Sequence, residues 1–170
     1  FSELEDELDY FIVDMAAGLS DSVMAFLAAC QHRFIVLKNE PSSIADAYAT
    51  IKVMIQDYSL DNISVIANSV LTQNEGRHLY RSINSVIKNF LGSEVNYLHS
   101  ISDDEMLLRA IKASQPILSF APASPAARDF STMAVILYFL TQKRDFFVFA
   151  FFFGIAGGGM SILTPDTVYG

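Results

Sequence analysis

Residues 34–67 read FIVLKNEPSSIADAYATIKVMIQDYSLDNISVIA, and the architecture of the chain can be worked out from them. An apolar run over 34–37 is followed by a loop at 38–42 and by a helix with apolar residues three and four positions apart. A second apolar run occupies residues 63–67. Short, continuous apolar runs are typical of strands buried on both faces of a parallel sheet. This strand–helix–strand unit predicts an α/β fold.

The same alternation continues on both sides of this unit. An apolar run at 10–13 precedes a helix that Ser20 can cap, with an apolar stripe of Val23, Phe26, Leu27 and Cys30. Downstream, a helix stops near Gly92, and its apolar stripe is Leu79, Ile83, Val86, Ile87 and Phe90. A weaker strand follows at 95–101, and Ser124-Pro125 opens a last helix. We therefore expect a partial doubly wound parallel sheet with helices on both faces.

Composition excludes several classes of protein. The 170 residues carry 11 Lys and Arg against 19 Asp and Glu, a net charge of -8, with a single cysteine. This excludes a disordered chain and a disulfide scaffold, and it disfavours direct binding to nucleic acid. Residues 1–9 are acidic rather than basic and then apolar, so no signal peptide is visible and we expect a cytoplasmic protein. Cys30 is expected to be a buried, reduced thiol.

The end of the chain has a different composition. Residues 146–163 carry no charge and hold six of the fourteen phenylalanines and four of the eight glycines. We divide the chain into a domain over 1–140 and a hydrophobic tail over 141–170. The apolar stretch has three interpretations: a hydrophobic membrane anchor, a strand-like segment, or sequence unrelated to the domain.

Ligands of parallel sheets bind at the carboxyl ends of the strands, which directs attention to 14–21, 38–43, 68–75 and 102–105. Asp14 follows a buried strand, where a carboxylate can hold Mg²⁺ through water beside a nucleotide phosphate. The alternative is that Asp14 only caps or turns the chain.

Asn68 and Asp46 also have two interpretations each. The Asn68 amide can pair with a base edge or can simply stabilise a turn. Asp46 lies near the start of its helix, where it can stabilise the helix or lie on a surface. The run 103–105 is acidic but is typical of a helix start, and the three histidines lack metal-ligand spacing.

Five blocks of the sequence follow known motifs in order. Residues 11–21 resemble a Walker B and switch II segment, D-x-x-A-G-[IL], and 39–52 resemble "PEPTSITDAYALIK". The other three blocks are 65–70 ("VVNRV"), 89–92 ("FLG") and 124–130 ("SPAARAF"). Together the five blocks resemble the flagellar-number regulators (FlhG/FleN-like) among the MinD/ParA-type P-loop ATPases. The resemblance covers residues 8–134 and implies a MinD-like P-loop NTPase fold, with ATP and Mg²⁺ as cofactors.

The resemblance also implies roles for individual residues. Asp14 matches the Walker B carboxylate that supports Mg²⁺ through water, and Gly18 matches the switch II glycine near the γ-phosphate. Asn68 matches the asparagine that reads adenine, and Asp103 lies in the loop that helps to hold the base. Asp46 matches an acid at the dimer and partner surface. We expect no catalytic residue in this chain itself.

Two departures from the family pattern matter. The "IP-x-D" loop reads Ile101-Ser102-Asp103-Asp104, with Ser102 in place of proline, and the "NR" dipeptide reads Asn68-Ser69. A larger departure is that the phosphate-binding loop, KGGxGK[ST], does not occur in these 170 residues. We therefore expect the C-terminal portion of such an ATPase, which alone does not hydrolyse ATP.

The family implies a nucleotide switch in the cytoplasm, with association at the inner membrane surface. Implied partners are a second copy in an ATP-bound homodimer and flagellar proteins: a signal-recognition-particle-type GTPase, a transcriptional activator or switch-complex proteins. The alternative is a non-catalytic interaction module or membrane-anchored module on the same fold. A partitioning or division ATPase is disfavoured by the blocks at 45–48 and 124–128.

Overall fold

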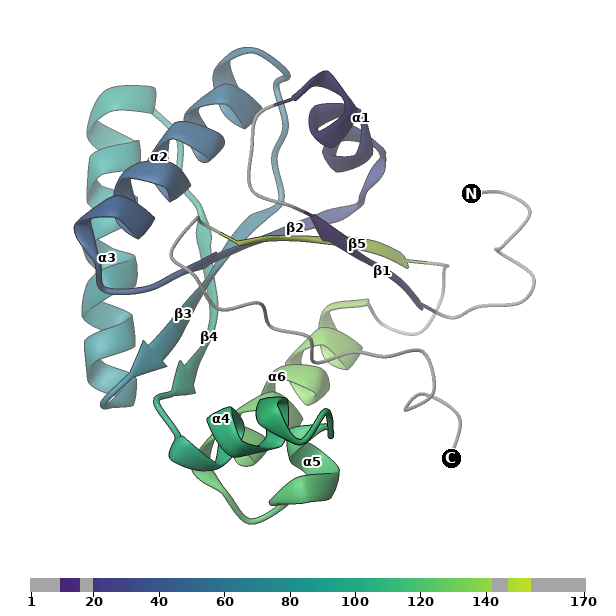
Figure 1. Ribbon diagram of the computed structural model, residues 1–170. Coiled ribbons are helices and arrows are strands. Elements are labelled where there is room, and N and C mark those ends of the chain that lie inside the picture. The colour runs from purple at the N-terminus through teal and green to yellow at the C-terminus, as the bar shows by residue number, and fades with distance from the viewer. Residues whose placement is uncertain (1–9, 16–19, 142–146, 154–170) are drawn as a thin grey trace.

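The computed structural model describes residues 10–15, 20–141 and 147–153, which form a sheet with helices on both faces (Figure 1). In chain order the elements are β1 (Tyr10–Met15), α1 (Asp21–Ala29), β2 (His32–Leu37), α2 (Pro41–Gln56), β3 (Ile63–Val70), α3 (Gln73–Leu91), β4 (Asn96–Ser102), α4 (Glu105–Lys112), α5 (Ile117–Phe120), α6 (Pro125–Thr141) and β5 (Phe147–Phe153).

Five parallel strands form the described sheet in the order β1-β5-β2-β3-β4. The four strands expected from the sequence are present, and the α/β prediction with a parallel sheet is confirmed. Part of the apolar tail forms the fifth strand, β5, between β1 and β2. This agrees with the strand-like interpretation of that stretch.

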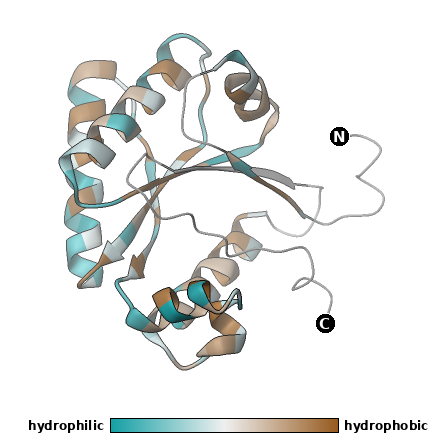
Figure 2. Ribbon diagram, in the orientation of Figure 1, coloured by the Kyte–Doolittle hydropathy of each residue, from teal (hydrophilic) through white to brown (hydrophobic). Residues whose placement is uncertain are grey.

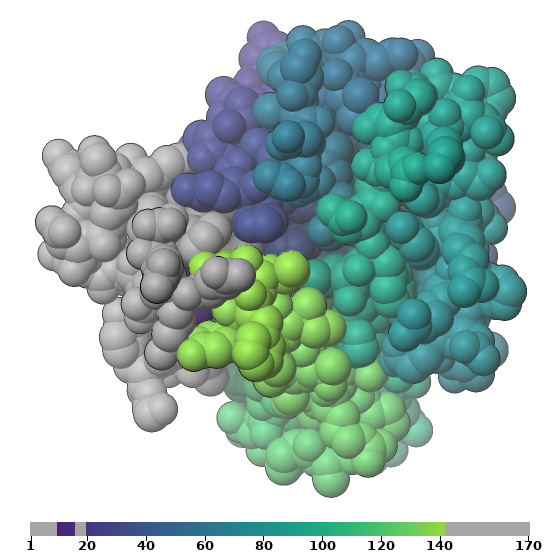
Figure 3. Space-filling view, turned by 180° about the vertical axis from the view of Figure 1, so that it is seen from behind, coloured from purple at the N-terminus to yellow at the C-terminus, as the bar shows by residue number. Residues whose placement is uncertain are grey.

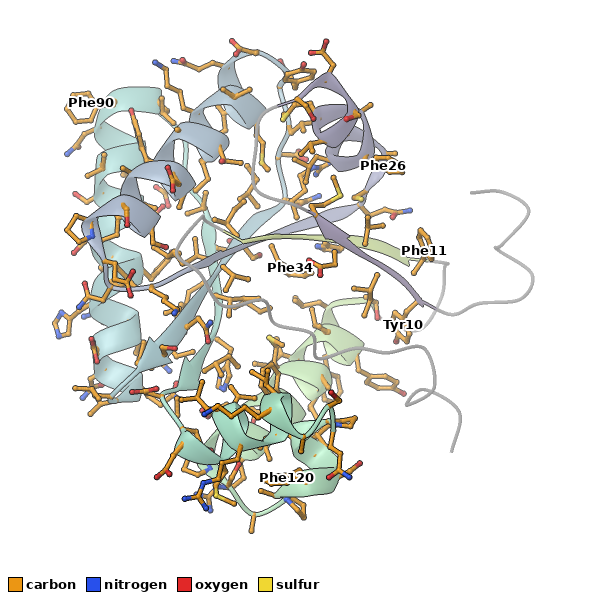
Figure 4. All side chains as sticks on the ribbon, in the orientation of Figure 1. Tyr10, Phe11, Phe26, Phe34, Phe90 and Phe120 are labelled. Atoms are coloured by element: carbon orange, nitrogen blue, oxygen red, sulfur yellow. The ribbon has the colours of Figure 1, made fainter. Side chains whose placement is uncertain are left out.

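Two apolar layers cover the sheet because the buried strands alternate their side chains between its faces. On β2, Ile35 and Leu37 join the cluster under α1, α2 and α3, whereas Phe34 and Val36 join the cluster under α4, α5 and α6. Figure 4 shows Phe34 on the side of the sheet that faces α6. Figure 2 shows apolar residues concentrated between helices and sheet, with hydrophilic residues on the outer side of α3.

Helix boundaries follow the expected local signals. The Ser20 hydroxyl accepts a hydrogen bond from the Val23 amide at the start of α1. Gly92 ends α3 in the left-handed conformation, with φ of 63°, where a residue without a Cβ is favoured. The short helix α5 was not expected from the sequence.

The predicted apolar faces were wrong in two places. On α1 the buried residues are Met24 and Leu27, while Phe26 is 47% exposed. The helix is apolar almost all round, so spacing alone did not fix which side packs. On α3, Val86 is 40% exposed and Phe90, in the last turn, is 73% exposed, whereas Leu79, Ile83 and Ile87 are buried as predicted. The loop after β2 is also shorter than 38–42, since α2 begins at Pro41.

A buried cation holds α1 against the amino-terminal end of β2. Arg33 donates to the carbonyls of Leu27 (2.8 Å), Cys30 (2.6 Å) and Asp61 (2.7 Å). The first two carbonyls lie at the C-terminus of α1, where a cation is favoured. Cys30 is buried and has a free thiol, as expected.

The view from behind shows α4–α6, in green, together at one end of the molecule, with α3, in teal, above them (Figure 3). Among the helices that the structure describes, none combines the length and apolar character needed to cross a membrane.

Candidate nucleotide-binding edge

The loops that follow β3 and β4 meet at the carboxyl edge of the sheet. The Asp103 amide donates to the Val70 carbonyl at 2.9 Å, so the chain leaving β4 is joined to the end of β3. Val70 and Ser102 are Cα partners in the last row of this pairing. Two predicted base-site residues, Asn68 and Asp103, are therefore brought to neighbouring strand ends.

Asn68 lies within β3, two residues before its end, and is half-buried. Its side-chain Oδ1 accepts a hydrogen bond from the Ser69 amide at 3.0 Å. Ser69 has a φ of 53°, and the strand pairing is irregular between Ala67 and Val70. This contact is typical of a turn residue. The side-chain carbonyl of Asn68 therefore already stabilises the local bend.

Asp14 lies at the other side of the same edge. It is the penultimate residue of β1, is exposed, and has Phe151 of β5 as its Cα partner. Partial desolvation of its carboxyl raises the pKa of Asp14 above the ordinary value. Three strand spacings separate β1 from β3, or about 14 Å, so Asp14 and Asn68 do not touch but could lie at opposite ends of one extended ligand.

The other two predicted residues do not join this group in the described structure. Gly18 lies outside the described residues. Asp46 lies in the second turn of α2 and is half-buried, and its backbone carbonyl accepts a hydrogen bond from the Thr50 hydroxyl at 2.9 Å. A role for Asp46 in a dimer or partner surface therefore remains a prediction.

A carboxylate that was not singled out from the sequence joins the loops after β2 and β3. Glu75 Oε1 accepts from the Asn39 side chain at 3.1 Å, and its Oε2 accepts from the Leu71 amide at 2.8 Å. The hydrogen bond from Leu71, followed by the one from Asn39, lowers the pKa of Glu75. The sequence signal was the Thr72-x-x-Glu75 pattern, which is typical of a capped helix start.

A second unforeseen carboxylate joins β4, α3 and α6. Asp129 Oδ2 accepts from the Ser102 amide (2.8 Å) and hydroxyl (2.6 Å), and Oδ1 accepts from the Gln73 side chain (3.1 Å). His99 Nε2 lies 3.6 Å from Oδ1. We call Gln73, His99, Ser102 and Asp129 the Asp129 cluster. Asp129 stands where the pattern "SPAARAF" has alanine, and Ser102 stands where "IP-x-D" has proline, so two departures from the pattern meet in one contact.

Asp104 has a structural role next to the same edge. Its Oδ1 accepts a hydrogen bond from the Met106 amide, and its Oδ2 accepts one from the Ala126 amide. Asp104 therefore caps the start of α4 and joins this helix to α6. Burial alone would raise the pKa of Asp104, but the amides of Ala126 and Met106 and the Ser124 hydroxyl lower it overall.

Asp103 is exposed. Within the described residues no group of three or more His, Cys, Asp or Glu could hold a metal ion.

The described residues fit the base of a nucleotide better than its phosphates. Asn68 and the 102–104 turn could line the base side, and the lone Asp14 carboxylate could hold Mg²⁺ through water rather than as one of several direct ligands. A phosphate cradle of backbone amides and lysine is not among the described residues. Asn68, Asp103 and Asp14 are therefore candidate contacts for the two ends of a nucleotide.

Comparison with known proteins identifies sequence relatives of this chain. It is 36% identical over 134 residues to the antiactivator FleN of Pseudomonas aeruginosa, a match that covers 79% of this chain and 48% of FleN. It is 35% identical over 131 residues to the flagellum site-determining protein YlxH of Helicobacter pylori, covering 76% of this chain and 44% of YlxH. This chain is a homologue of the MinD/ParA-type flagellar-number regulators. No family model matches it.

The chain spans about half the length of these flagellar-number regulators. Among solved structures it is similar to the MinD cell division protein of Aquifex aeolicus, with a TM-score of 0.55 and 20% identity. That match covers 71% of this chain and 49% of MinD, and it supports a MinD-like P-loop NTPase fold. The resemblance stated from the five sequence blocks is therefore confirmed.

Proposed function

We propose that this chain is the C-terminal portion of a MinD-like ATP-binding regulator of flagellar number and placement. The observation that carries the proposal is the 36% identity to FleN over 134 residues. The meeting of the β3 and β4 ends at the carboxyl edge, which would form the base side of a nucleotide site, supports it.

In this proposal Asn68 and the turn with Asp103 hold the adenine, and Asp14 supports Mg²⁺ through water. ATP, when bound, supplies a γ-phosphate whose presence or absence distinguishes two states of the loop after β1. The chain's own residues position the nucleotide and do not break a bond, so this chain alone does not turn over ATP. Asp46 belongs to the surface that meets a second copy or a flagellar partner.

The test is a chimera in which residues 8–134 replace the matching part of FleN in a Pseudomonas strain that lacks FleN. We expect flagellar number per cell, counted by electron microscopy, to return toward that of the parent strain. Asn68→Ala in the chimera should abolish this rescue, whereas Ser85→Ala, at an exposed position on α3, should not.

Two results would contradict the proposal in different ways. A chimera that accumulates and folds but leaves flagellar number as in the deletion strain would remove the regulatory function. Rescue that survives both Asp14→Ala and Asn68→Ala would instead support an interaction module that has no need of nucleotide.

A further inference from the structure

The loops after β3 and β4 belong to a closed ring of contacts that also includes α6. The Asp103 amide donates to the Val70 carbonyl, which joins the turn after β4 to the end of β3. At the start of α3, the Gln73 side chain donates to Asp129 Oδ1 at 3.1 Å. Asp129 Oδ2 accepts from Ser102, the residue before Asp103, and this contact closes the ring. The ring therefore includes both loops that were assigned to the base side of the site.

The α6 side of this ring is the part that the core holds in place. Phe130, next to Asp129, and Met133 are buried in the cluster that α6 forms with Leu98 and Ile101 of β4. The Asp129 side chain itself is only 15% exposed. Because protein cores are closely packed, α6 cannot move far without disturbing this cluster. Asp129 is therefore the fixed member of the ring, and the two loops are the members that it holds.

The contacts of Asp129 with Ser102 act on the backbone directly before Asp103. Both hydrogen bonds end on the same oxygen, Oδ2, which lies 2.8 Å from the Ser102 amide nitrogen and 2.6 Å from its hydroxyl. Hydrogen bonds to a carboxylate are shorter and stronger than those between neutral groups. An amide donor also fixes the orientation of its peptide plane. The direction in which the chain leaves β4 toward Asp103 is therefore set from α6.

The other oxygen of Asp129 faces the start of α3 and β4. The Gln73 side chain donates both to Oδ1 and to the Ser100 carbonyl, the latter at 3.3 Å. His99 Nε2 lies 3.6 Å from Oδ1, and among the described side chains this nitrogen is buried without a hydrogen-bond partner. An asparagine at 129 would keep an acceptor for Ser102 and would bring an NH₂ donor toward His99 Nε2. Asparagine is therefore the conservative replacement for this aspartate.

We propose that Asp129 is a positioning residue for the base of the nucleotide, because it fixes the separation between Asn68 and Asp103. This inference rests on the proposed function, in which those two residues hold the adenine. Asp129 acts through Ser102 and Gln73, which lie in the two loops. Without the carboxylate the ring is open, and binding of a base must first order the turn at 102–104.

Titration of the full-length chain with adenosine tests this role, because adenosine carries the base without phosphates. The amide signals of Asn68 and Asp103 in proton–nitrogen NMR spectra report both the site and the dissociation constant. Asp129→Ala should weaken binding about tenfold, the effect of ordering about one residue of the turn on binding. Asp129→Asn should stay within about threefold of the parent chain, since it keeps an acceptor for both groups of Ser102.

Two further variants complete the set. Thr132→Ala is the matched control, because Thr132 is an exposed residue of α6 whose hydroxyl donates to the Arg128 carbonyl of the same helix. It should leave the dissociation constant unchanged. Gln73→Ala, at an exposed position, opens the ring on the α3 side and should weaken binding about threefold. Gln73→Ala decides the question if Asp129→Ala does not fold, and unchanged binding would then overturn the proposal.

The outcomes separate this inference from the proposed function. Circular dichroism selects conditions in which every variant is fully folded, so a loss of stability alone leaves the dissociation constant unchanged. If folded Asp129→Ala binds adenosine as well as the parent does, Asp129 is not a positioning residue, and the proposed base site stands. An Asp129→Asn variant as weak as Asp129→Ala would also overturn the inference. If adenosine shifts neither amide in the parent chain, the base site of the proposed function is wrong, and this inference falls with it.

Discussion

The contact between Ser102 and Asp129 gives the sharpest prediction about the candidate edge. Ser102→Pro removes both the amide proton and the hydroxyl that Asp129 accepts, and Asp129→Ala removes the acceptor. Proline at position 102 has no amide proton and therefore breaks the contact with Asp129. The backbone can accept a proline at this position, because the preceding residue, Ile101, already lies in an extended strand. The double variant carries the two residues of the "IP-x-D" and "SPAARAF" patterns.

The magnitudes follow from the hydrogen bonds. A hydrogen bond to a charged group contributes about 1.5–3 kcal/mol, and two of them join Ser102 to a carboxylate whose side chain is only 15% exposed. Each single variant should lose about 3 kcal/mol of unfolding free energy, since it leaves its former partner unsatisfied. The double variant should lose about the same and not the sum, which corresponds to a coupling of about 3 kcal/mol.

Urea unfolding of the full-length chain and the three variants measures this coupling. Ser85→Ala, an exposed change on α3 far from the cluster, serves as the control and should alter stability by less than about 0.5 kcal/mol. If the double variant loses the sum of the two single losses, Ser102 and Asp129 do not stabilise the turn together and the reasoning is refuted.

Three further predictions concern packing, a buried cation and pH. Gly76→Ala should destabilise the chain by about 1–3 kcal/mol in urea unfolding, because a Cβ there would lie 1.8 Å from Ser100 Oγ; a gain in stability would contradict the packing of α3 on the sheet. Arg33→Met should cost about 2–4 kcal/mol by thermal unfolding, because three carbonyls lose their donor, and a loss under about 0.5 kcal/mol would contradict this role. The folded-state pKa of Asp104 is lowered, so its stabilisation is present above the unfolded pKa and is lost as pH falls through the folded value. Asp104→Asn should therefore flatten the fall in urea midpoint as the pH is lowered below about 4, and parallel curves for variant and parent would disprove it.

The sequence predicted the strands well because continuous apolar runs have few other uses in a domain of this size. It predicted α1 less well, since Met24 and Phe26 are both apolar and only tertiary packing decides which one is buried. Glu75 could have been found from its capping pattern, although its contact with Asn39 depends on how two loops meet. Asp129 could not have been found in this way, because it lies 27 residues after Ser102 in the sequence and only the fold brings the two residues together.

The two ends of the proposed nucleotide site differ in what holds them in position. Hydrogen bonds to Glu75, Asp104 and Asp129 fix the loops after β2, β3 and β4 from within residues 32–141, so the base side is preorganised whatever lies between β1 and β2. The position of Asp14 is different, because its strand, β1, pairs with β5, which comes from the other end of the chain. Loss of the pairing with β5 should therefore alter the Mg²⁺ side of the site while leaving the base side in place. On this argument, the two sides of the site can fail separately: loss of the β5 pairing would move Asp14, and loss of the base contacts would not.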